Sequence, residues 1–124
     1  MRLRRSIAVT GTFVGFHHWP DAPNEVAYLR EVHRHIFHFK VFFDVSHNDR
    51  QKEFHMMKDV VGKHIYETQG ARSKEILTWS CEQWAEHILN GLQVLDVYRV
   101  EVWEDGENGG IVELTDQRHF HRAV

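Results

Sequence analysis

The stretch from Val32 to Phe43 constrains the fold of this chain more than any other segment. It is rich in aromatic and β-branched residues, which favour a β-strand. Side chains alternate between the two faces of a strand, so His33 and His35 share one face. That face continues with Phe37, Phe39, Val41 and Phe43. Two imidazoles at this spacing lie about 6–7 Å apart along the strand, so both could bind one metal ion if a third ligand came from elsewhere.

Composition bounds the class of protein. A chain of 124 residues suits one domain, which we expect to span residues 1–124. The formal charge of −3 gives no general electrostatic reason to bind nucleic acid or an acidic membrane. Histidine is the unusual component, at 11 of 124 residues. Because neutral imidazole is the commonest metal ligand, this surplus favours a metal site.

The sequence contains no feature typical of secretion or membrane insertion. Cys81 is the single cysteine, so an intramolecular disulfide is excluded. No apolar run approaches the length of a transmembrane helix. The amino-terminal residues are basic, but residues 6–16 are interrupted by threonines and glycines and lack a cleavage pattern. We therefore expect a cytoplasmic protein.

Alternating patterns predict four strands, the last two forming a hairpin. The expected ranges are Ile7–His17, Val32–Phe43, Val97–Glu104 and Ile111–Thr115, with a turn over Asp105–Gly110. The connection Glu25–Glu31 has no clear pattern.

Helical spacing predicts two helices between the second and third strands. The first runs from Glu53 to about Tyr66, before a break at Gly70. The second begins near Ser80, with Gln83 in position to complete a capping box. The apolar stripe of the first helix comprises Phe54, Met57, Val61 and Ile65. The order ββααββ predicts an α+β fold, with one four-stranded antiparallel sheet and both helices on a single face.

A third histidine lies at the end of the first strand. His17 shares the parity of the apolar residues before it, so it is the candidate partner of His33 and His35. Three histidines leave a fourth position open, as in catalytic zinc sites. His18 is the alternative ligand, because a bulge would exchange its face with that of His17. The structural alternative is three half-buried histidines hydrogen-bonded to backbone.

Two further histidines have the same spacing. His119 and His121 lie near the carboxy terminus, where a frayed tail is the simpler interpretation.

These motifs resemble the 6-pyruvoyltetrahydropterin synthase and 6-carboxytetrahydropterin synthase family over about residues 7 to 115. His17 ends a Phe-x-x-x-His segment, and His33-Arg34-His35 matches the family's His-Gly-His with Arg34 in place of glycine. Three shorter motifs follow in the family's order: Glu53-Phe54 with Met57-Lys58, Ser80-Cys81-Glu82, and Val102-Trp103-Glu104.

The resemblance implies the tunnelling fold, in which subunits join their sheets into a barrel, here a homo-hexamer built as a dimer of trimers. It implies Zn²⁺ bound by His17, His33 and His35, and a pterin-like ligand whose ring is held by Glu104. A carboxylate suits that role because it accepts two parallel hydrogen bonds. The alternative for Glu104 is an ordinary acid at a strand end.

The usual proton-transfer residues of that family do not match this chain. Leu29 stands where the family has its catalytic cysteine, and Lys63 to Trp79 contains no Asp-His pair. Cys81 falls on the apolar face of the second helix, so we expect it in the core. The remaining candidates for proton transfer are Glu31, His64 and Glu67.

Two functions of different class follow from this pattern. One is a zinc-dependent lyase acting on a reduced pterin or related deazapurine precursor. The other is a metal- and pterin-binding protein without that chemistry. A zinc hydrolase of another substrate is a third possibility.

Overall fold

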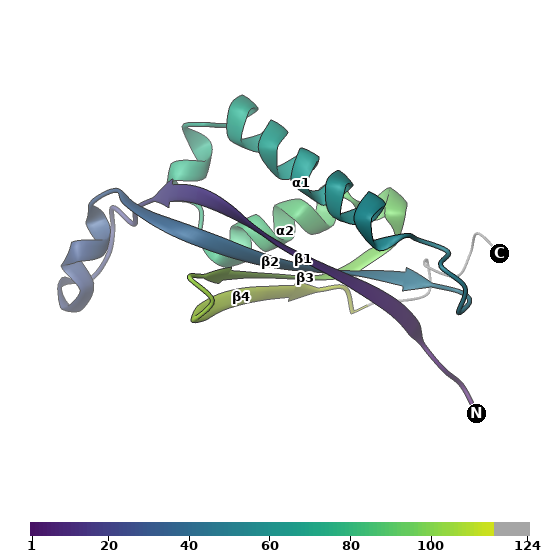
Figure 1. Cartoon of the computed structure of the whole chain (residues 1–124). Helices are drawn as coiled ribbons and strands as arrows, with labels where there is room; N and C mark the ends of the chain where they lie inside the picture. Colours follow the sequence, from purple (N-terminus) through teal and green to yellow (C-terminus); the bar gives the residue numbers. More distant parts are fainter. Residues whose placement is uncertain (116–124) are drawn as a thin grey trace.

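The computed structural model describes residues 1–115, which form a four-stranded antiparallel sheet with two α-helices on one face (Figure 1). The fold is therefore α+β. The strands are β1 (Arg5–His17), β2 (His33–Val45), β3 (Val97–Glu104) and β4 (Asn108–Glu113), and they lie side by side in that order. The helices α1 (Phe54–Ala71) and α2 (Cys81–Gly91) connect β2 to β3. Three short 3₁₀ helices complete the described elements: η1 (Asn24–Arg30), η2 (Glu75–Thr78) and η3 (Gln93–Leu95).

The β3–β4 turn is shorter than expected. Strand β4 begins at Asn108 because Asp105 and Gly106 adopt positive φ angles of 53° and 73°, which reverse the chain within three residues. The predicted break at Gly70 is wrong, since α1 continues to Ala71. A single glycine costs a helix only about 1 kcal/mol relative to alanine, which neighbouring residues can offset.

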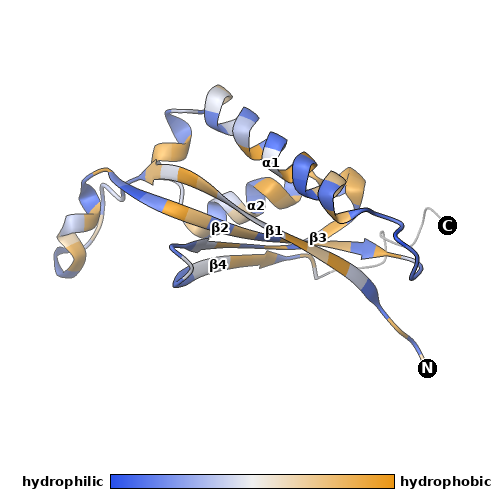
Figure 2. Cartoon of the chain, in the orientation of Figure 1, coloured by the Kyte–Doolittle hydropathy of each residue, from blue (hydrophilic) through white to orange (hydrophobic). Residues whose placement is uncertain are grey.

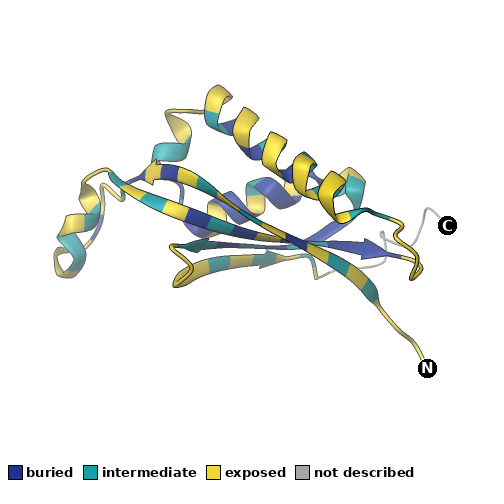
Figure 3. Ribbon diagram, viewed as in Figure 1, coloured by how far each residue is buried: buried dark blue, intermediate teal, exposed yellow. Residues whose placement is uncertain are grey.

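The core lies between the helices and the sheet. The expected row of β2 is buried throughout, which confirms its parity: Phe37, Phe39, Val41 and Phe43. From the other side, α2 contributes Trp84, Ala85, Ile88 and Leu89. Figure 2 shows hydrophobic residues on both layers, and Figure 3 shows the same regions of α2 and β3 buried. Across residues 1–115, no helix combines the length and apolar character needed to cross a membrane.

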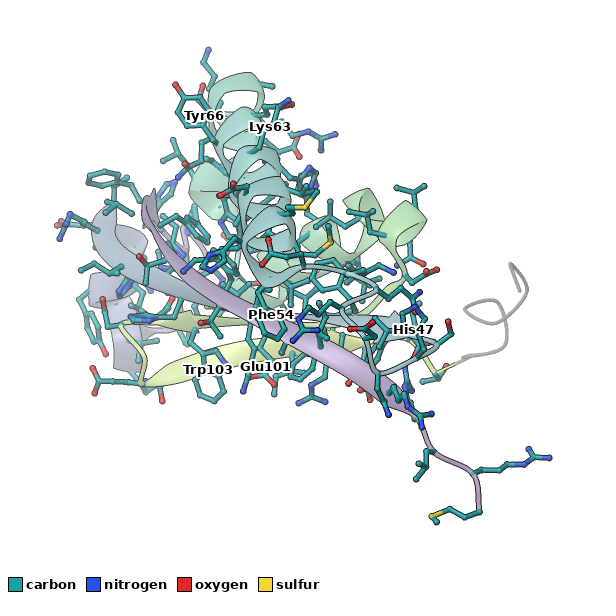
Figure 4. All side chains as sticks on the ribbon, turned by 45° about the vertical axis from the view of Figure 1, so that its right-hand side comes forward. His47, Phe54, Lys63, Tyr66, Glu101 and Trp103 are labelled. Carbon is teal, nitrogen blue, oxygen red and sulfur yellow. The ribbon has the colours of Figure 1, made fainter. Side chains whose placement is uncertain are left out.

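Helix α1 packs along β1 with a narrower apolar stripe than expected. Val61 and Ile65 are buried, but Phe54 is 59% exposed, so its assignment to the buried stripe is wrong. Phe54 is the first helical residue, and packing against the core begins only at Met57. The outer side of α1 carries Tyr66, which points away from the sheet (Figure 4).

The opposite face of the sheet is open and mixed in character. Glu101 and Trp103 project from it, on the side away from α1 (Figure 4). Glu101 accepts hydrogen bonds from Arg99 at 3.0 Å and from Trp103 Nε1 at 3.0 Å. His38 and Lys40 belong to this face, as their parity predicts.

The start of α2 lies directly against β4, and this contact shapes one side of the fold. A Cβ on Gly110 would lie 2.6 Å from the backbone nitrogen of Glu82. We therefore expect Gly110→Ala to destabilise the protein by about 1–3 kcal/mol, the usual cost of overpacking. Urea unfolding measures the change.

Gly62→Ala is the matched control for Gly110→Ala. Gly62 lies within α1, and a Cβ there meets nothing within 4 Å. Alanine at position 62 should stabilise the protein by about 0.5–1 kcal/mol through helix propensity. Equal effects of the two substitutions would contradict the close packing of α2 on β4.

Candidate metal centre

The register of β1 on β2 brings three histidines together. His17 is the cross-strand partner of His33, and His35 lies opposite Gly15 two residues further along. Residues paired across an antiparallel ladder have Cβ atoms about 4.5–5.5 Å apart. The ring of His17 lies 4.6 Å from that of His33 and 5.0 Å from that of His35.

The three rings form one cluster with a common centre. Those of His33 and His35 lie 4.8 Å apart. One nitrogen of each of the three residues lies within 4.8 Å of the other two. Within residues 1–115, this is the single group of histidine, cysteine or acidic side chains with the spacing of a metal site. His17 is buried and the other two are half-buried.

Each ring is oriented by a hydrogen bond at Nδ1. The partner is the carbonyl oxygen of Trp79 for His17, at 3.0 Å, and that of Glu31 for His33, at 2.8 Å. For His35 the partner is Oδ2 of Asp105, at 2.7 Å.

These three partners fix the tautomer of every ring. A carbonyl or carboxylate oxygen only accepts, so each Nδ1 must carry the proton and donate it. In a neutral ring, Nε2 is then left with its lone pair. A histidine that binds a metal through one ring nitrogen almost always donates a hydrogen bond from the other ring N–H to a backbone carbonyl or a carboxylate. The arrangement is that of three histidines prepared to bind a metal ion.

Glu104 points at the same centre. It lies opposite Phe37 in the β2–β3 register, so it is on the face that carries the histidines. Its Oε2 is 3.1 Å from Nε2 of His17 and 3.8 Å from Nε2 of His35. Glu104 ends the buried row that includes Val100 and Val102, so the apolar side of the sheet becomes polar at this end.

Burial and hydrogen bonding set the charge of the cluster. Burial lowers the pKa of His17, which favours the neutral imidazole that binds metals. The hydrogen bond with His35 lowers the pKa of Asp105, and the Ile36 N–H adds to this effect. Asp105 therefore stays ionised and remains an acceptor for His35.

A pocket of about 510 Å³ adjoins the cluster. This volume is within the usual range of about 300–1,000 Å³ for small-molecule sites. Its walls come from the end of β1, the start of α2 and the β3–β4 hairpin. The lining residues include His17, His33, Trp19, Leu29, Trp79, Cys81, Gln83, Glu104 and Asn108. A ligand in this pocket would contact two of the three histidines and Glu104.

Neither the alternative ligand His18 nor the side chains suggested for proton transfer belong to the histidine cluster. His18 is not part of the cluster, and its Nδ1 lies 3.1 Å from the carbonyl oxygen of Arg30. His64 stacks on His87 between α1 and α2, with ring centres 4.9 Å apart. Glu67 is exposed and lies 3.9 Å from Lys63. Glu31 contributes its backbone carbonyl to His33. His119 and His121 lie outside the described residues.

Leu29 and Cys81 both line the pocket. Cys81 is buried against the core, as expected, but its position at the start of α2 also brings it to the pocket wall. Burial, with the charges of Glu104 and Glu82, raises the pKa of its thiol to about 12. Because the thiolate is the nucleophilic form, Cys81 is inert at neutral pH.

Three groups that orient the rings are not identified from the sequence. Two are the backbone carbonyls of Glu31 and Trp79, whose position no side-chain pattern reveals. The third is Asp105, an acid directly after Glu104 in the hairpin turn. The Asp-Gly sequence indicates a turn. The hydrogen bond between Asp105 and His35 forms only because β2 lies beside that turn.

Asp105→Asn should weaken metal binding through the tautomer of His35. Oδ1 of Asp105 accepts from the Ile36 N–H at 3.0 Å while Oδ2 accepts from His35. Asparagine keeps one acceptor, so its NH₂ group would face Nδ1 and move the ring proton to Nε2. We expect zinc affinity to fall about 10–100-fold, measured by competition with a chromophoric chelator. Glu107→Gln removes the same charge from the exposed hairpin as a control. Equal affinity of both variants would contradict this role.

Comparison with protein-family models finds none that matches this chain, and comparison with curated proteins finds no match. The functional interpretation therefore rests on the residues and geometry of the chain itself.

Proposed function

We propose that this protein binds a zinc ion through His17, His33 and His35. The observation that carries the proposal is the hydrogen bond at each Nδ1, which leaves Nε2 of three clustered neutral rings available to a metal ion. Imidazole nitrogen is a preferred ligand of zinc, and three histidines are a known protein ligand set for it. The motif resemblance to the 6-pyruvoyltetrahydropterin synthase family supports zinc as the metal.

The organic ligand in this proposal is a reduced pterin or a related deazapurine precursor. A bicyclic ring of this class fits a pocket of about 510 Å³. Trp79 and Leu29 supply apolar surface, and the carboxylate of Glu104 lines the same pocket beside His17. Because a carboxylate has two oxygens, Oε2 can face the histidines while Oε1 accepts hydrogen bonds from the ring.

In this arrangement the metal and the protein side chains have different roles. Zinc, when bound, supplies Lewis-acid polarisation of a hydroxyl or carbonyl oxygen of the substrate side chain. The protein orients the ring through Glu104 and places the indole of Trp79 beside it. The lyase reaction also requires a proton to be moved. A side chain positioned for that transfer contributes about 10²–10⁴-fold to a rate.

A binding protein without this chemistry is the second candidate, and the pocket lining favours it. Leu29 lines the wall at the position where the family that the motifs resemble has its thiol, and its side chain has no ionisable group. Cys81 lines the same pocket as a neutral thiol. Both candidates therefore bind the metal and the pterin-like ring. They differ in whether the protein also catalyses the lyase reaction.

We also propose assembly into a homo-hexamer, a dimer of trimers with the tunnelling-fold barrel. The support is that β1 and β4 form the edges of the described sheet. Long edge strands are usually covered, paired or closed into a barrel. Strand β1 is 13 residues long and exposes Val14 and Phe16. Pairing of edges between subunits would cover these groups.

Sedimentation tests the assembly. At micromolar concentration we expect a species of six chains of 14.8 kDa each. A monomer under these conditions would refute edge pairing.

Metal analysis tests the zinc site. Protein purified without a tag should contain about one zinc ion per chain, and His33→Ala should contain clearly less, since the substitution removes one of the metal ligands. His47→Ala is the matched control, because His47 is exposed and follows the end of β2 opposite the cluster. Substoichiometric metal that is unchanged by His33→Ala would refute the site.

Turnover of dihydroneopterin triphosphate separates the two functional candidates. We expect binding with slow release of the side-chain product, about 10²–10⁴-fold below an enzyme with a positioned acid-base group. Cys81→Ala should leave this rate unchanged, because a thiol with a pKa of about 12 is not ionised at neutral pH. Fast turnover that disappears in Cys81→Ala would show that the thiol is catalytic.

A further inference from the structure

Glu104 makes a contact that the histidine tautomers do not explain by themselves. Its Oε2 lies 3.1 Å from Nε2 of His17, within the distance of a hydrogen bond. A hydrogen bond needs a proton between the two atoms. Nδ1 of His17 already donates to the carbonyl oxygen of Trp79, so a neutral His17 has no proton at Nε2.

Two lone pairs therefore face each other across this contact unless a cation lies between them. His35 likewise donates from Nδ1 to Asp105, but its Nε2 is 3.8 Å from Oε2 of Glu104, which is beyond hydrogen-bond distance. A proton on Nε2 of His17 would satisfy the 3.1 Å contact but would prevent that nitrogen from binding a metal. With zinc at the three Nε2 atoms, the metal itself is the cation that Oε2 faces.

The spacing between Glu104 and His17 agrees with a shared metal. Zinc binds histidine nitrogen at about 2.0–2.1 Å and carboxylate oxygen at about 2.0–2.2 Å, so two neighbouring ligand atoms of a tetrahedral shell lie about 3.3 Å apart. The 3.1 Å between Oε2 and Nε2 of His17 is close to this value, whereas the 3.8 Å between Oε2 and Nε2 of His35 is longer, so the carboxylate must move toward His35 when the metal binds. Glu104 also comes from β3, on the side of the cluster that β1 and β2 leave free.

We infer that Glu104 is the fourth protein ligand of the metal, through Oε2. This inference rests on the proposed zinc site and raises the number of its protein ligands from three to four. The protein alone then supplies three nitrogens and one oxygen, a complete tetrahedral shell. A ligand that reaches the metal from the pocket must displace Oε2 or add as a fifth donor. An organic ligand that carries a hydroxyl or carbonyl oxygen meets this requirement.

Metal binding in the absence of any organic ligand tests the inference. Glu104→Gln and Glu104→Ala are compared with wild-type protein and with Glu107→Gln, an exposed acid in the same hairpin. Two quantities are measured: zinc affinity by chelator competition, and the visible absorption of the Co²⁺-substituted protein. We expect both Glu104 variants to lose at least about 10-fold in zinc affinity, the lower end of the loss for an outer-shell residue. We also expect their Co²⁺ spectra to change because a ligand is replaced, and Glu107→Gln to match wild type in both measurements.

The spectrum separates ligation from a simple charge effect. Weaker binding with an unchanged Co²⁺ spectrum would mean that Glu104 acts only through its charge, and would overturn the inference. Unchanged affinity would overturn it as well. If wild-type protein fails to bind zinc, the proposed zinc site itself is wrong. A crystal structure of the zinc-bound wild type gives an answer independent of variant folding: Oε2 within about 2.2 Å of the metal supports ligation, and a water molecule in that position refutes it.

Discussion

The register of β1 on β2 is the constraint on which the rest of the structure depends. It places His17 opposite His33 and, by the same pairing, Phe13 opposite Phe37. A slip of one residue would turn every side chain of β1 to the other face. The histidines would then separate, and the apolar row of β1 would leave the core. Burial of the core and alignment of the metal ligands are thus maintained by one set of backbone hydrogen bonds.

The metal cluster forms where the apolar face of the sheet becomes polar. Along β2 the buried row ends at Phe37, and His35 and His33 continue it toward the strand end. Along β3 the same row ends at Glu104. Buried polar groups are costly unless they are hydrogen-bonded. The groups that meet this need come from other segments, namely the carbonyl of Trp79 before α2 and the carboxylate of Asp105 in the hairpin.

The sequence predicts the elements and the faces of the strands well because these depend on local periodicity. Parity alone assigns His17, His33 and His35 to one side, and the capping box at Ser80 is present. The failures have tertiary causes. Phe54 has helical spacing but lies before the first turn that contacts the core. The Asp105 side chain binds His35 because β2 and the hairpin lie together. No pattern in the sequence reveals a carbonyl oxygen as an acceptor.

The tautomers of the three histidines test the account most directly. Long-range ¹H–¹⁵N correlation spectra of metal-free protein report which ring nitrogen carries the proton. The account predicts the Nδ1–H form for His17, His33 and His35, and zinc addition should shift the Nε2 resonances of these three rings. Rings that carry their proton on Nε2 instead of Nδ1, or zinc-dependent shifts confined to other histidines, would contradict it.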